Sequence, residues 1–259
     1  MTDLANAPAS APDQPKTVET RLSIGPAGNG RLIAWLVLIA VMAALGFATE
    51  APVSDQATQT SGGFGQPATR YDDSFYRYSF GIGGIVDYAV LLGIVLLIAR
   101  GLPRRETFAL YRPKSWPRTI GLVLRVLATT YVLIIVVGSA LGPGAETDQG
   151  IPLFWDGSRA AQFALNFVVV AAVAPIVEEL MFRGLGFSLL SRFGPRIALV
   201  GTAVAFGLIH GFLFALPIFV IVGLSLGWLR MRTGSVYPGM LMHGVFNSAA
   251  TILAVSLGP

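Results

Sequence analysis

Two adjacent glutamates, Glu178 and Glu179, lie inside the apolar run AAVAPIVEELMFRG and are the last acids of the chain. An ionised side chain at membrane depth costs about 2.5 to 3.5 kcal/mol on insertion scales, so it marks a functional site by default. Arg183 follows Glu179 by four residues, which places both on one helix face and permits a purely structural ion pair. Glu178 points about 100° away from Glu179. It therefore needs its own partner or its own proton.

The two histidines of the chain, His210 in AFGLIHGF and His243 in GMLMHGVFN, also lie inside apolar runs. A single membrane histidine often serves only as an interhelical hydrogen-bond donor. Here, however, both histidines are placed in this way. Asn247 follows His243 by one helical turn and shares its face, while Phe206 precedes His210 by one turn and is predicted to pack against it.

These polar groups are predicted to share one depth in the membrane. We take Arg192, Arg196 and Arg232 as markers of the cytoplasmic side. Glu178, His210 and His243 lie about 14, 14 and 11 residues from them, or roughly 16 to 21 Å along a helix. A carboxylate in a low-dielectric cavity, beside a histidine that shares its proton, is a general base able to activate water. A second histidine and an asparagine could donate hydrogen bonds to an oxyanion. The combination predicts amide hydrolysis.

Other hydrolytic sites find less support in the sequence. No Ser/His/Asp arrangement stands out, and an HExxH zinc helix is absent because Gly211 and Gly244 follow the two histidines. The chain contains no cysteine, which excludes a thiol nucleophile, a thiolate metal site and disulfides.

The elements that carry these residues are predicted to be membrane helices. Of the 259 residues, 54% are hydrophobic and 12% are charged, against about 25% charged in soluble domains. Apolar runs long enough to cross a bilayer recur along the chain. They cover residues 32–48, 80–99, 120–141, 161 to beyond 182, 197–214 and 236–257, with a shorter run at 218–229. The sequence predicts an all-α polytopic bundle of about seven transmembrane helices, within a range of roughly six to eight.

Charge predicts how the chain is oriented and organised. Residues 100–118 carry six basic residues and one acid, which places this loop, and with it the N-terminus, in the cytoplasm. Residues 1–30 are rich in Ala, Pro, Ser, Asp and Gln and are predicted to form a disordered cytoplasmic tail, followed by one membrane domain over residues 31–259. The net charge of +4 comes from such loop clusters, so nucleic-acid binding is not expected. Asp87 and Arg125, inside two of the apolar runs, are predicted to pair with each other or to snorkel.

Three ordered motifs carry a resemblance to a known family. They are EExxxR at Glu178, Glu179 and Arg183, FxxxH at Phe206 and His210, and HxxxN at His243 and Asn247. This set resembles the motifs of the CPBP family of intramembrane peptidases, also called the Abi or CAAX-protease-like family. The resemblance covers about residues 105–257, which we take as the peptidase core, and leaves the tail and the first helix outside it or only loosely related.

The resemblance implies an α-helical membrane endopeptidase of the bacterial plasma membrane whose substrate is a membrane-associated protein or peptide. Eukaryotic members remove the last three residues of prenylated CaaX proteins, and other members have been linked to bacteriocin immunity. Carried over by motif, Glu178 and His210 would activate water and His243 with Asn247 would stabilise the oxyanion. Glu179 and Arg183 would support that geometry.

The family has been described both as metal-dependent and as a metal-free glutamate peptidase. Glu178, His210 and His243 could ligate zinc. The sequence lacks the usual closely spaced ligand pair on one helix, which favours metal-free chemistry without a cofactor. Two other classes stay open, a proton-coupled transporter and a non-catalytic membrane scaffold that uses the same buried residues. The chain shows no internal repeat, which weakens transporter architectures built from duplicated halves.

Overall fold

The computed structural model describes residues 29–49, 74–142, 152 and 154–257. Nearly all of the predicted tail of residues 1–30 thus lies outside the described residues. The described residues form helices and turns and contain no strand. Their longer helices are α1 (Asn29–Thr49), α2 (Tyr78–Ile98), α4 (Trp116–Leu141), α8 (Pro195–Leu208), α9 (Leu216–Thr233) and α10 (Tyr237–Leu257).

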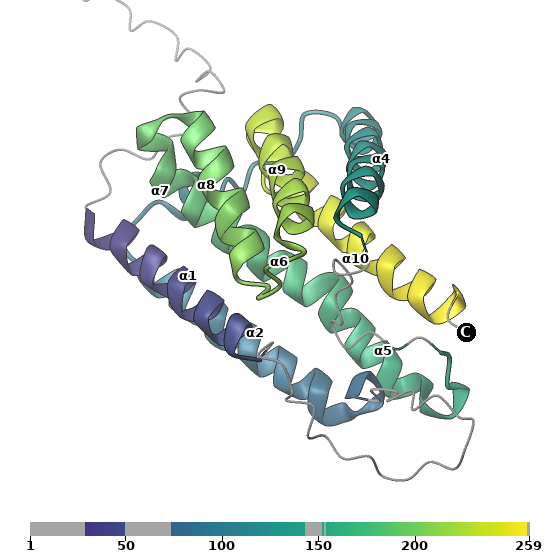
Figure 1. The fold of residues 1–259 in the computed structure, drawn as a ribbon. Coiled ribbons are helices and arrows are strands. Elements are labelled where there is room, and N and C mark those ends of the chain that lie inside the picture. Colours follow the sequence, from purple (N-terminus) through teal and green to yellow (C-terminus); the bar gives the residue numbers. More distant parts are fainter. Residues whose placement is uncertain (1–28, 50–73, 143–151, 153, 258–259) are drawn as a thin grey trace, which may run out of the picture.

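One long helical segment of changing pitch crosses the middle of the bundle. It comprises α5 (Ala160–Val168), a π-helical turn (Val169–Val173), α6 (Ala174–Glu179), a second π-helical segment (Leu180–Gly186) and α7 (Phe187–Leu190). Figure 1 shows this segment between the α1 and α2 pair on one side and α4, α9 and α10 on the other. The residues of α6 are therefore central.

The described residues contain six helices that are long and apolar enough to cross a membrane, and α8 is a shorter apolar helix. This confirms the predicted helical membrane bundle and its range of helix number. The predicted span 197–214 is too long, because α8 ends at Leu208 and Gly211 adopts a φ of 83° that interrupts the helix. The predicted short run 218–229 is too short, because α9 begins at Leu216 with Pro217 in its first turn.

Small residues let the helices approach closely around the central segment. Trp35 of α1 lies directly over Gly186, and its indole Nε1 donates a hydrogen bond to the carbonyl of Met181 at 3.2 Å. On the opposite side, a Cβ on Gly244 of α10 would lie 2.7 Å from the carbonyl oxygen of Ala171. Such contacts are typical of membrane helix packing, in which close backbone approach replaces the hydrophobic effect.

The basic ends of several helices gather at one end of the bundle. The Arg31 guanidinium, at the start of α1, donates a hydrogen bond to the carbonyl of Arg100, just after α2. The backbone N–H of Val236, between α9 and α10, donates to the carbonyl of Ala109 at 3.2 Å. The start of α1, the basic segment 100–118 and the α9–α10 connection thus share one side of the bundle.

Candidate active site

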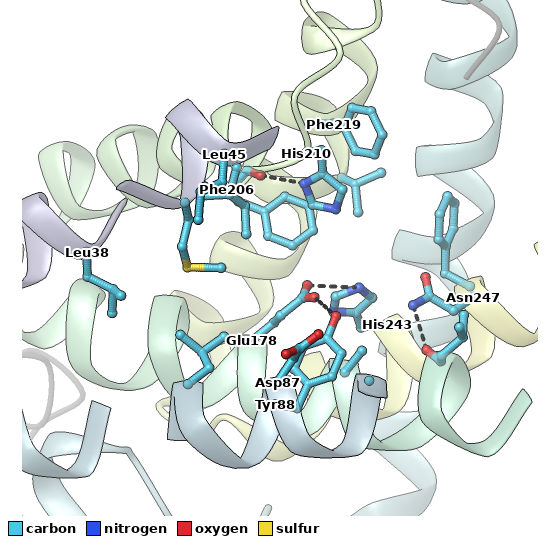
Figure 2. A pocket seen from close by; sticks show the side chains of 18 of the residues that line it. Leu38, Leu45, Asp87, Tyr88, Glu178, Phe206, His210, Phe219, His243 and Asn247 are labelled. Atoms are coloured by element: carbon cyan, nitrogen blue, oxygen red, sulfur yellow. Dashed lines mark hydrogen bonds and ion pairs between the residues drawn. The ribbon is translucent and has the colours of Figure 1, made fainter. Parts of the chain in front are cut away.

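A cavity of about 890 Å³ lies at the centre of the bundle. Its walls come from α1, α2, α4, α8, α9, α10 and the central segment. Glu178, His210, His243 and Asn247 all line it, so the structure brings together the four residues singled out in the sequence (Figure 2). Their predicted common depth agrees with this arrangement.

Glu178 is held from two sides. It lies on α6 with 7% of its surface exposed. The hydroxyl of Tyr88, from α2, donates a hydrogen bond to Glu178 Oε1 at 2.9 Å. The other oxygen, Oε2, lies 3.8 Å from Nε2 of His243. One carboxylate oxygen is thus fixed, while the other faces a histidine at a distance too long for a hydrogen bond.

Glu179 points to the other side of the helix and forms the predicted ion pair. Arg183 Nη1 donates to Glu179 Oε1 at 2.9 Å, and Arg183 Nη2 donates to the carbonyl of Gly223 at 2.8 Å. Both side chains are fully buried. The second carboxylate oxygen of Glu179 occupies the space that a side chain on Gly239 would fill. The pair is a buried strut between the central segment, α9 and α10.

His243 stands between the two glutamates. Its Nδ1 lies 3.6 Å from Glu179 Oε1 and its Nε2 lies 3.8 Å from Glu178 Oε2. Because an acceptor faces each ring nitrogen, the ring is placed to act as a hydrogen-bond donor. Arg183, through Glu179, therefore supports the orientation of His243 as well as that of its own helix.

His210 lies in the turn after α8, where its ring is fixed by two aromatic neighbours and one backbone group. Its Nδ1 is 2.7 Å from the carbonyl oxygen of Phe206, so Nδ1 donates this hydrogen bond, and Nε2 is an acceptor whenever the ring is neutral. The ring stacks on Phe219 at 4.2 Å between centroids and contacts the Phe206 ring at 4.7 Å, as predicted for Phe206. The free base nitrogen of the site is thus His210 Nε2.

Asn247 is anchored by the first π-helical turn. Its Nδ2 donates a hydrogen bond to the carbonyl of Val170 at 2.9 Å. A π-helical turn leaves the regular α-helical pairing and exposes carbonyl groups to side-chain donors, and such turns are frequent at functional sites. An amide nitrogen carries two hydrogens, so one remains for another acceptor in the cavity.

The structure pairs the histidines with Glu178 differently from the simplest sequence interpretation. His243 is the histidine that lies within 4 Å of the Glu178 carboxylate, whereas His210 stands across the cavity with the Phe206 ring beside it (Figure 2). The reason is the position of His210 in a turn rather than on a helix face. Helical spacing could not predict where that ring points.

Two cavity residues of α2 were missed or misplaced by the sequence interpretation. Tyr88 lies outside the three motifs, and its only signal was a hydroxyl in an apolar run. Asp87 was expected to pair with Arg125 or to be structural. Instead Asp87 lines the cavity, and Arg125 Nε donates to the carbonyl of Gly121 in its own helix. Of the two alternatives, pairing or snorkelling, the pair of Asp87 and Arg125 is therefore not present in the structure.

Three possible zinc ligands, Glu178, His210 and His243, line the cavity. Among the described residues, no three His, Asp or Glu side chains converge on a point that could hold a metal ion. His210 Nδ1 donates to the Phe206 carbonyl, and Glu178 Oε2 lies 3.8 Å from His243 Nε2. In this arrangement Glu178, His210 and His243 do not form an assembled three-ligand site.

Comparison with known proteins points to one family. Residues 160–249 match the model of the Rce1-like family of type II CAAX prenyl endopeptidases. The chain is 26% identical over 199 residues to a Bacillus subtilis (strain 168) protein described as "Putative membrane peptidase YdiL", covering 73% of this chain and 78% of that relative. No solved structure matches the chain.

The matched residues 160–249 hold all three motifs and fall within residues 105–257, the range of the resemblance. The helical membrane bundle, the order of the motifs and the two comparisons agree with one another. Both comparisons thus support the resemblance of this chain to the CPBP family of CAAX-protease-like membrane peptidases.

Proposed function

We propose that this chain is an intramembrane endopeptidase in which Glu178 activates the attacking water without a metal ion. The observation that carries the proposal is the arrangement around Glu178. Tyr88 holds one of its oxygens at 2.9 Å, while the other faces the cavity that His210, His243 and Asn247 share. A fixed carboxylate in a largely apolar cavity has the placement that a general base requires.

In the first step, a water molecule would attack the peptide carbonyl and give its proton to the Glu178 carboxylate, while His210 accepts a hydrogen bond from the same water and orients it. His210 is suited to this role because Nδ1 is bound to the Phe206 carbonyl, which leaves Nε2 as the acceptor. The proton held by Glu178 would then pass to the leaving amine. Distances between catalytic groups are often long without substrate and shorten in the complex, so the present separation of the two groups is compatible with this role.

In the same step, His243 and Asn247 would donate hydrogen bonds to the oxyanion. His243 has a carboxylate facing each nitrogen, and Asn247 is fixed through its bond to the Val170 carbonyl. Donors that are held in place before the reaction stabilise developing charge without reorganising. Glu179 and Arg183 hold the His243 side of the site and are positioning residues.

The substrate is expected to reach the cavity from the bilayer. Several cavity-lining side chains of α1 and α2 are also strongly exposed on the protein surface, with 63% for Leu45 and 58% for Val90. In a membrane these exposed apolar side chains face lipid. A membrane-associated peptide could therefore enter beside α1 and α2 without crossing a polar surface. We further expect the basic end of the bundle, and the N-terminus, to lie in the bacterial cytoplasm.

The experiment is cleavage of a quenched, membrane-anchored peptide library by the purified protein in detergent. We expect Glu178→Gln to reduce cleavage by about 10²- to 10⁴-fold, the usual contribution of a general base. The matched control is Glu106→Gln, which removes an exposed acid of the basic segment and should leave the rate unchanged. Wild-type cleavage is expected to survive a chelator.

Three outcomes would contradict the proposal. Loss of activity with chelator and its recovery with zinc would replace the metal-free mechanism by a metal site. Equal rates for wild type and Glu178→Gln would remove Glu178 from the chemistry. Solute uptake that depends on Glu178 in the absence of any cleavage would favour a transporter.

A further inference from the structure

Asp87 is a carboxylate at the middle of a membrane-spanning helix. It stands ten residues into α2, about 14 Å from one end and about 16 Å from the other at 1.5 Å per residue. Its side chain is exposed and lines the same cavity as Glu178, near Tyr88 (Figure 2). An acid at this depth is costly and is retained where it has a function.

No cation of the described residues neutralises Asp87. It forms no hydrogen bond or ion pair with them, and Arg125, the partner considered in the sequence analysis, donates through Nε to the carbonyl of Gly121 in its own helix. The titratable side chains that line the cavity with Asp87 are Tyr88, Glu178, His210 and His243. The lining residues include two carboxylates and no lysine or arginine.

We propose that Asp87 is a subsite of the cavity for a cationic side chain of the substrate, the ammonium of a lysine or the guanidinium of an arginine near the scissile bond. This inference rests on the proposed function. An ionised carboxylate only accepts hydrogen bonds, and its strongest partners are charged donors. A metal ion does not meet this requirement here, because no three suitable ligands converge among the described residues.

The same arrangement discriminates between substrates. A lysine carried into the membrane by a peptide is itself costly, and pairing with Asp87 neutralises both groups at once. A neutral residue in its place leaves Asp87 unpaired, and a glutamate is repelled by both Asp87 and Glu178. Selection thus comes from an attractive contact and a repulsive one, the combination that specific sites use.

The test compares membrane-anchored peptides that differ only by Lys or Gln at one position, scanned across the residues flanking the cleaved bond. For the wild type we expect kcat/KM to favour the Lys peptide by about tenfold or more at one position, the range of one charge-assisted contact. Asp87→Asn should bring the Lys-to-Gln ratio close to one, whereas Asp87→Glu should keep the preference. Asp87→Lys should favour the matching Glu peptide. Glu106→Gln, which removes a distant exposed acid, should leave the wild-type ratio unchanged.

A binding measurement separates this inference from the proposed function. It compares the affinities of fluorescent Lys and Gln peptides for the Glu178→Gln protein and for the same protein that also carries Asp87→Asn. Cleavage without charge preference, or a preference that persists in Asp87→Asn, overturns the subsite and leaves the peptidase intact. Tighter binding of the Lys peptide that depends on Asp87, together with a wild type that cleaves no peptide, supports the subsite and overturns the peptidase. Equal binding of both peptides, together with no cleavage by the wild type, overturns both.

Discussion

The cavity has two walls that differ in character. The motif wall, made of the cavity-lining residues between Val170 and Asn247, carries the three motifs and lies within the matched range 160–249. The α1–α2 wall, made of the cavity-lining residues of these two helices, lies outside that range and is mostly apolar.

His210 and Asn247 of the motif wall are tied to the backbone by short contacts, and the fully buried pair of Glu179 and Arg183 lies behind this wall. Several side chains of the α1–α2 wall are exposed instead, and only Tyr88 and Asp87 interrupt its apolar surface. Under the proposed function, the reactive groups and the substrate-facing groups come from different parts of the chain. Changes in the motif wall should therefore affect chemistry and stability together, and changes in the other wall should affect activity with little effect on stability.

The largest effect is expected from breaking the buried ion pair of Glu179 and Arg183 behind the motif wall. Arg183→Met leaves the Glu179 carboxylate buried without its cation, which typically costs about 3 to 5 kcal/mol. Thermal unfolding in detergent measures the loss. The double variant with Glu179→Met should recover a large part of it, because it removes the uncompensated charge. If the single variant is as stable as the wild type, the ion pair does not contribute to the stability of the fold.

The next effect tests whether α1 positions the reactive histidine. A side chain on Gly46 would lie 2.9 Å from the Ile209 carbonyl oxygen and 3.1 Å from the Gly211 nitrogen, beside His210. Gly46→Leu should displace this turn by about 1 Å and lower kcat by about 10²-fold. Gly93→Leu on α2, where a side chain meets open space, is the matched control and should keep the wild-type rate. Equal rates for both variants would show that α1 does not support His210.

A smaller effect is expected at the one polar contact between the walls that fixes Glu178. Tyr88→Phe removes the 2.9 Å hydrogen bond to Glu178 Oε1. A hydrogen bond to a charged group contributes about 1.5 to 3 kcal/mol, so kcat should fall by roughly 10- to 100-fold with KM little changed. Tyr78→Phe, at the exposed start of α2, is the control. A change confined to KM would assign Tyr88 to substrate binding instead.

The smallest effect is expected outside both walls, at the start of the central segment. Asp156 accepts hydrogen bonds from Ser158 N and Ser158 Oγ at 2.9 and 2.6 Å and from Arg159 Nε at 2.6 Å. The Ser158 hydroxyl first, and then Arg159, lower the pKa of Asp156 from 3.8 to about 2. Because the folded pKa is the lower one, the stabilisation is present above about pH 4 and is lost as the pH falls toward 2.

Thermal unfolding of wild type and Asp156→Asn across pH checks this contribution. A small stability difference is expected at pH 7, and it should vanish near pH 2, with the cleavage rate at pH 7 unchanged. A difference that grows as the pH falls would contradict the sign. A loss of activity would show that this end of the bundle communicates with the cavity.

Sequence reasoning was most reliable for the residues on helices. The spacing of Glu179 and Arg183 predicted an ion pair that is present, since four residues make one helical turn. It was least reliable where the helix departs from regular geometry. Helical periodicity does not predict the two π-helical segments that flank α6. It therefore does not predict that the Val170 carbonyl, in the first of them, accepts a hydrogen bond from Asn247.

The sequence by itself determined that the chain is a membrane bundle and which glutamates, histidines and asparagine are candidates, because hydropathy and helical spacing are local properties of the chain. Only the tertiary structure decided that His243 rather than His210 lies against Glu178, that Tyr88 holds this carboxylate, and that Asp87 faces the cavity instead of Arg125. Each of these depends on the rotation and packing of helices far apart in the chain. Those are set by the close approach of small residues such as Gly186 and Gly244, which periodicity does not encode.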